Sequence, residues 1–145
     1  TRFVLVEFSH SDTFEYICQG IQQIQMKGYE VILAHFERYP CMYKDIGNAE
    51  HLKHMGVRIQ VNADSITGEN GWKMKRFVKQ LLEHRLVFCV GTDAHSPKGR
   101  PPRMRKAAEY VEKKYGEEYA RRIFFSNARI MLRKKKKDES GQSNT

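Results

Sequence analysis

Residues 31–35 read Val-Ile-Leu-Ala-His, a short continuous apolar run that ends at a histidine. A run of this kind is typical of a strand that is buried on both faces of a parallel sheet. Similar apolar runs recur at residues 3–6, 57–61 and 86–90. The sequence therefore predicts four buried strands of the parallel type.

Segments with helical spacing separate these strands. Between residues 12 and 27 the apolar positions Phe14, Ile17, Ile21 and Ile24 recur every three or four residues, with Ser11 or Asp12 as the cap and Gly28 as the stop. Further helices are predicted at residues 42–55, 71–84, 103–115 and about 117–132. The order β-α-β-α-β-α-β-α predicts an α/β fold of parallel βα repeats, either an open sheet or part of a barrel.

Each predicted strand ends at polar or ionisable side chains, which are Glu7, His35, Asn62, and the pair Asp93 and His95. In such folds the chemistry lies at the carboxyl ends of the strands. The Asp-x-His pair directs both side chains to the same side of an extended backbone. We therefore predict a metal site formed by Glu7, His35, Asp93 and His95, with a donor set that suits Mn, Fe or Zn better than Ca or Mg. The alternative for Asp93 and His95 is a turn with a hydrogen-bonded histidine.

Two arginines follow predicted strands in loops that could face the same rim. Arg38 lies three residues beyond His35, and Arg100 lies five residues beyond His95. Guanidinium groups bind phosphate oxygens in a bidentate manner, so this pair is typical of a phosphoester site. Arg103 is a competing candidate, and surface solubility is the alternative reading of each arginine.

The cysteines do not fit a thiolate phosphatase. Such an enzyme needs an arginine six residues after the nucleophile, but the sixth residue after Cys18, Cys41 and Cys89 is isoleucine, glycine and histidine respectively. There is no CxxC pair, so we expect free thiols, with Cys89 in the core. No Walker-type loop or Ser-His-Asp order is present either. Metal-activated water is the remaining route to hydrolysis.

Composition indicates one soluble domain at residues 1–132, followed by a basic, frayed tail at 133–145. The 145 residues are 40% hydrophobic and 30% charged. No apolar run is long enough to span a bilayer and no signal peptide is evident, so a cytoplasmic protein is expected. The net charge of +9 comes without any RNA-binding or recognition-helix motif, so no nucleic acid partner is predicted.

Four segments in the same order resemble the motifs of one family, the PHP-type manganese-dependent protein-tyrosine phosphatases of capsule and exopolysaccharide clusters. They are VLVEFS (4–9), ILAHFERY (32–39, with Phe36 where proline is usual), VNADSITGENG (61–71) and GTDAHSPKGRPP (91–102). The resemblance implies the rear half of a distorted (βα) barrel with up to three metals, manganese or iron. It also implies metal ligation by Glu7, His35, Asp93 and His95, phosphate contacts by Arg38 and Arg100, and the phosphotyrosine tail of a capsule-synthesis kinase as substrate.

The amino-terminal HxH portion of that family has no counterpart in this sequence. We therefore expect the chain by itself to be close to inactive and to self-associate through uncovered strand edges. Two other interpretations stay open. One is a non-catalytic remnant that folds as a homo-oligomer, and the other is a PHP phosphatase of small phosphoesters such as histidinol phosphate.

Overall fold

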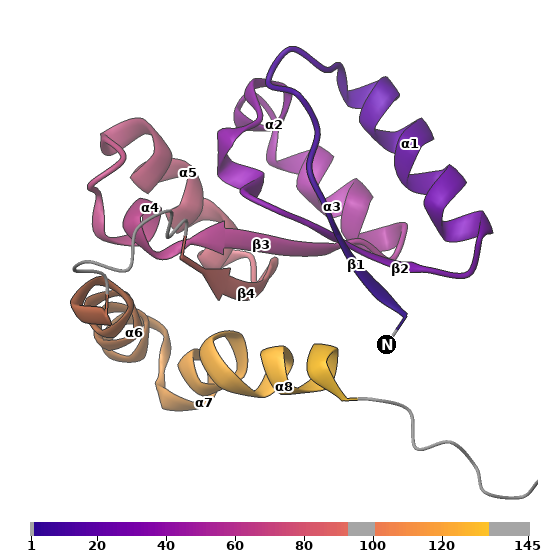
Figure 1. Cartoon of the computed structure of the whole chain (residues 1–145). Helices are drawn as coiled ribbons and strands as arrows, with labels where there is room; N and C mark the ends of the chain where they lie inside the picture. The colour runs from indigo at the N-terminus through magenta and orange to yellow at the C-terminus, as the bar shows by residue number, and fades with distance from the viewer. Residues whose placement is uncertain (1, 93–100, 134–145) are drawn as a thin grey trace, which may run out of the picture.

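The computed structural model describes residues 2–92 and 101–133 (Figure 1). Its centre is a four-stranded sheet in the order β1-β2-β3-β4, in which every neighbouring pair is parallel. The strands are β1 (Phe3–Val6), β2 (Glu30–Leu33), β3 (Arg58–Asn62) and β4 (Val87–Gly91). The predicted α/β fold of parallel βα repeats is confirmed.

Helices connect the strands and continue the chain after β4. They are α1 (Phe14–Met26), the 3-10 turn η1 (Phe36–Arg38), α2 (Pro40–Tyr43), α3 (Ile46–His54), α4 (Ala63–Thr67), α5 (Trp72–Glu83), α6 (Pro101–Tyr115), α7 (Glu117–Arg121), the π-helical turn η2 (Arg122–Ser126) and α8 (Asn127–Leu132). In Figure 1, α1 and α3 lie on one side of the sheet, and α7 and α8 lie on the other. Within the described parts of the chain, no helix is long and apolar enough to cross a membrane.

Several predicted helix boundaries are wrong, for local reasons. The predicted helix at 42–55 is two helices, because the side chain of Asp45 accepts a hydrogen bond from the Gly47 amide and starts α3 anew. The cap of α1 is Thr13, whose hydroxyl accepts from the Tyr16 amide, rather than Ser11 or Asp12. The short elements η1 and α4 were not predicted, since three to five residues are too few to show a period.

Strand β1 also departs from the prediction of a strand buried on both faces. It is an outer strand of the described sheet, and the side chain of Leu5 is 58% exposed. Val4 and Val6, which point the other way, pack against the core. One face of β1 is therefore uncovered.

The core lies between the sheet and the helices that pack on it. Fully buried side chains from α1, β2, α3, β3 and α5 fill this layer, among them Ile17, Ile21, Leu33, Leu52, Val61, Val78 and Leu81. Cys89 of β4 is 2% exposed, which confirms its predicted place in the core. All three cysteines are free thiols. The strands are thus held rigidly by packing, and their carboxyl ends carry the polar residues described next.

Candidate metal centre

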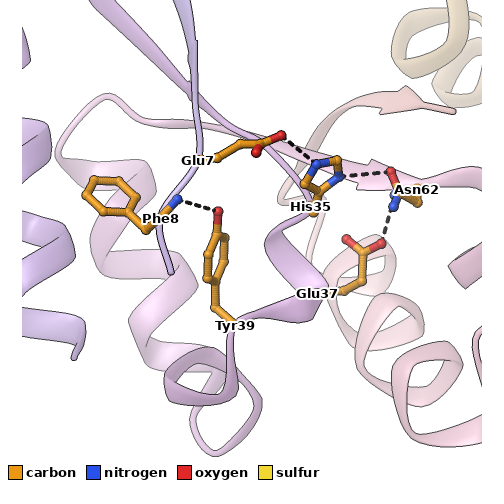
Figure 2. A network of polar contacts seen from close by, with 6 residues as sticks. All are labelled: Glu7, Phe8, His35, Glu37, Tyr39 and Asn62. Atoms are coloured by element: carbon orange, nitrogen blue, oxygen red, sulfur yellow. Dashed lines mark hydrogen bonds and ion pairs between the residues drawn. The ribbon is translucent and has the colours of Figure 1, made fainter. Parts of the chain in front are cut away.

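Glu7 and His35 meet at the carboxyl edge of the sheet. Glu7 directly follows β1 and His35 lies two residues beyond β2, and their Oε1 and Nε2 atoms are 2.8 Å apart. Because β1 and β2 are parallel and paired from Phe3–Glu30 to Val6–Leu33, their ends lie side by side. Figure 2 shows the carboxylate and the imidazole pointing toward each other. The structure therefore brings together two of the four predicted metal ligands.

His35 has an unusual backbone for a residue with a side chain. Its φ of 49° and ψ of 44° lie in the left-handed region, which costs free energy for residues other than glycine. The His35 carbonyl accepts a hydrogen bond from the Arg38 amide at 2.8 Å, which closes η1. This turn directs the chain back over the sheet edge and places the imidazole beside Glu7.

Asn62, the last residue of β3, orients the histidine ring. Its Oδ1 lies 3.3 Å from Nδ1 of His35, and the residue is 2% exposed. With this carbonyl as the acceptor, Nδ1 carries the proton and Nε2 presents a lone pair toward Glu7. Two acceptor atoms at 2.8 Å repel each other unless a proton or a cation lies between them. The spacing suits two ligands of one metal ion, whose bonds are about 2.0–2.2 Å.

Glu37 is a fully buried carboxylate beneath this pair, in η1. Its Oε1 accepts hydrogen bonds from the backbone amide of Asn62 at 2.9 Å and from the hydroxyl of Ser65 at 2.6 Å. Ser65 in turn accepts from the side chain of Asn70 at 3.0 Å. Burial raises the pKa of Glu37, while the hydrogen bonds from Ser65 and Asn62 oppose that effect. Glu37 thus fastens the turn after β2 to the end of β3, where Asn62 faces His35 (Figure 2).

Two further contacts tie the loop after β1 to the same turn. The hydroxyl of buried Tyr39 accepts from the amide of Phe8 at 3.1 Å (Figure 2). Nδ1 of His10 lies 3.1 Å from the carbonyl oxygen of Arg38. These contacts fix the position of Glu7 relative to His35. They were not predicted from the sequence, because Tyr39 and Glu37 stand in an apparently polar segment.

The remaining predicted site residues are only partly described. Asp93, His95 and Arg100 lie outside the described residues, as does the tail at 134–145. Arg38 stands in η1, directly after Glu37. Arg103, the competing phosphate candidate, donates to Asp64 of α4 at 3.1 Å, so it joins α6 to α4. Among residues 2–92 and 101–133, no three His, Cys, Asp or Glu side chains gather as a metal site.

The cysteines provide a clear prediction about the nucleophile. Burial raises the pKa of the Cys89 thiol to about 12, and burial also raises the pKa values of Cys18 and Cys41. A thiol with a raised pKa is a poor source of thiolate at neutral pH. We expect replacement of all three cysteines by alanine to leave the phosphatase activity that the sequence predicts for a longer protein, one that also has the amino-terminal HxH portion, unchanged within about twofold, measured with a phosphotyrosyl peptide. Loss of activity in a variant that keeps its circular dichroism spectrum and its metal would instead assign the chemistry to a cysteine.

Comparisons with known proteins point to one family. The family described as "Capsular polysaccharide synthesis, CpsB/CapC" matches residues 1–133. Tyrosine-protein phosphatase CpsB of Streptococcus pneumoniae is 33% identical over 91% of this chain and 56% of its own length. Tyrosine-protein phosphatase YwqE of Bacillus subtilis is 31% identical over 92% of this chain and 52% of its own length. The chain thus spans about half the length of these curated relatives.

A solved structure agrees with the sequence comparison. It comes from crystal structures of YwqE from Bacillus subtilis and CpsB from Streptococcus pneumoniae, described as unique metal-dependent tyrosine phosphatases. Its TM-score is 0.74 at 31% identity, and the match covers 83% of this chain and 49% of that chain.

Proposed function

Because the chain belongs to the CpsB/CapC family of capsular polysaccharide synthesis proteins, we propose that it carries the rear part of a metal-dependent protein-tyrosine phosphatase. The substrate would be phosphotyrosine on the tail of a capsule-synthesis kinase. The relatives that match this chain are named tyrosine-protein phosphatases, and the matching solved structure is described as that of metal-dependent tyrosine phosphatases. A kinase tail of this sort and three free thiols both go with a cytoplasmic location.

In this proposal Glu7, His35, Asp93 and His95 hold the metal, with manganese preferred and iron or zinc as alternatives. The mixed carboxylate and imidazole donors favour such metals over calcium or magnesium. A bound metal of this kind supplies an activated water at neutral pH. The chain's own part is to hold these ligands in place, and Asn62 does so by fixing the ring of His35 at 3.3 Å.

Arg38 and Arg100 would bind the phosphoryl oxygens and stabilise the charge that develops on them. The backbone of Arg38 is fixed on both sides, since its amide donates to His35 and its carbonyl oxygen lies 3.1 Å from His10. A fixed backbone limits the region that the guanidinium can reach, and a guanidinium binds phosphate oxygens in a bidentate manner. Arg38 is therefore the residue that we assign to substrate orientation.

One observation carries this proposal, namely the 2.8 Å approach of Glu7 and His35 at the carboxyl edge of parallel strands. To test it, Mn²⁺ binding and phosphotyrosyl-peptide hydrolysis would be measured for this chain and for a longer protein that has the full length of the curated relatives. We expect the longer protein to turn over at about 1 per second or faster, an ordinary enzymatic rate, and this chain to bind Mn²⁺ weakly and hydrolyse very slowly. If the longer protein binds Mn²⁺ but hydrolyses only histidinol phosphate, the substrate is a small phosphoester and not phosphotyrosine.

One observation favours a second candidate, a non-catalytic remnant that self-associates. Besides Leu5 on β1, large apolar side chains stay exposed on the last helical segment, with Phe125 at 64% and Leu132 at 80%. Uncovered apolar surface beside a strand edge promotes association between copies. Both candidates predict association of this chain, so sedimentation velocity alone does not separate them. Metal content and turnover of para-nitrophenyl phosphate in added Mn²⁺ do, since the remnant would bind at most one metal weakly and show no turnover.

A further inference from the structure

We propose that a cavity at the amino-terminal ends of β3 and β4 binds a small organic anion, independently of the metal centre. The cavity has a volume of about 790 Å³ and lies between these strand ends and the segment of α7 and η2. Arg58 begins β3, whereas Glu7, His35 and Asn62 stand at the opposite ends of the strands. Four strand residues at about 3.3 Å each separate the two ends by about 13 Å. The cavity is therefore a separate place in the fold.

Arg58 is one of the cationic residues that line the cavity. Its guanidinium carbon lies 5.6 Å from the ring centroid of Phe3 and 5.1 Å from that of Phe88. Its Nε is buried and has no hydrogen-bond partner within the described residues. In the same part of the chain no carboxylate lies within ion-pair distance of Arg58. Aromatic rings lie over the guanidinium of this partly exposed residue, and its buried Nε is left without an acceptor among the described residues.

Two tyrosines on the opposite wall add further donors. The hydroxyl oxygen of Tyr115 is buried without a hydrogen-bond partner among the residues described, and that of Tyr119 is buried close to the backbone of Val87, which leaves its proton to donate. The guanidinium of Arg85 lies 4.2 Å from the ring centroid of Tyr119 and 5.5 Å from that of Tyr115. Burial raises the pKa of Tyr119 to about 12, so that phenol stays protonated and can donate at neutral pH. Buried donors of this kind favour a ligand that accepts hydrogen bonds.

The acidic residues at the cavity do not neutralise Arg58 or Arg85. Glu117 and Glu118 are exposed residues of α7. The carboxylate of Glu117 pairs with the guanidinium of Arg121, and that of Glu118 with the guanidinium of Arg122, each at 3.3 Å. Valine, isoleucine, leucine and phenylalanine from β3 and β4 form much of the remaining wall. An oxyanion on an apolar or aromatic body matches both features, since the oxyanion meets the donors and the body meets the wall.

The test is a titration of the ¹⁵N-labelled 145-residue chain, followed by NMR amide shifts. The probes are phenylphosphonate and benzoate, with sodium chloride at equal ionic strength as the reference. We expect saturable shifts at residues 85–88 and 115–119, with a Kd below about 1 mM for at least one probe. Phosphonate preference would indicate a phosphate-bearing ligand, and benzoate preference would indicate a carboxylate.

Variants decide whether the assigned donors bind the probe. Arg58→Met keeps an apolar stem between the two phenylalanines and should weaken binding at least about tenfold, as expected for a lost bond to a charged group. Tyr115→Phe removes one hydroxyl only and should weaken it several-fold, even if Arg58→Met fails to fold. Arg105→Met, at an exposed arginine of α6, is the matched control and should leave the Kd unchanged.

Three outcomes would overturn the proposal. The first is an unchanged Kd in both the Arg58→Met and Tyr115→Phe variants. The second is a set of shifts confined to Glu7, His35 and Asn62, which would place the probe at the metal centre. The third is a set of cavity shifts that follow protein concentration rather than probe, which would make the cavity an interface between copies.

Discussion

Replacing His35 by glycine is expected to weaken Mn²⁺ binding by at least about a hundredfold. The imidazole Nε2 is one of the two donor atoms that the structure places 2.8 Å apart. Loss of residues that merely orient a metal ligand costs about 10–100-fold in affinity, and loss of the ligand itself should cost no less. Glycine is the appropriate replacement because His35 has a φ of 49°, which glycine adopts without strain.

The measurement is electron paramagnetic resonance of free Mn²⁺ during a titration of a longer protein with the length of the curated relatives, in which we expect binding to be tight enough to follow. His54→Ala is the matched control, since His54 is an exposed histidine on α3 whose Nδ1 lies 2.7 Å from the carbonyl oxygen of Glu50, away from the metal centre. The Mn²⁺ affinity of Asn62→Leu should lie between those of His35→Gly and His54→Ala. We expect a loss of about tenfold or more, because the His35 ring loses its partner at Nδ1. If His35→Gly and His54→Ala bind Mn²⁺ equally well, His35 is not a ligand.

The apolar runs predicted the strands because a parallel strand in a layered fold must be apolar over its whole length. The run at 31–34 became β2 with Val31 and Leu33 fully buried. The same rule was wrong for Leu5, whose exposure depends on what lies beyond β1 and not on the residue itself. Burial on the second face is a tertiary property that a local pattern does not contain.

The candidate site was predictable only where a polar residue closes an apolar run. Glu7 and His35 met this condition, and the structure places them in contact. Glu37 did not, because a glutamate beside an arginine in a polar segment is normally on the surface. Its burial results from the left-handed turn at His35 and from the amide and hydroxyl groups that surround it. Such a site follows from the packing of the chain and has no local signal in the sequence.

Replacing Glu37 by leucine is expected to lower the free energy of unfolding by about 2–4 kcal/mol. Leucine fills a similar volume but cannot accept the hydrogen bonds from the amide of Asn62 and the hydroxyl of Ser65. Each buried donor that is left without an acceptor costs about 1–3 kcal/mol, and relief of the buried carboxyl offsets a part of this. Urea unfolding followed by circular dichroism would measure the change in this chain.

Glu37→Gln separates the hydrogen bonds from the charge. Its amide oxygen can accept from both Asn62 and Ser65, and its NH₂ group takes the place of Oε2, which is buried without a partner among the described residues. We expect this variant to be destabilised less than Glu37→Leu, because the acceptor for Asn62 and Ser65 is kept and only the new NH₂ group is left without a partner among the described residues. If glutamine and leucine destabilise the chain equally, the negative charge of Glu37, and not its role as an acceptor, holds the turn after β2 to the end of β3.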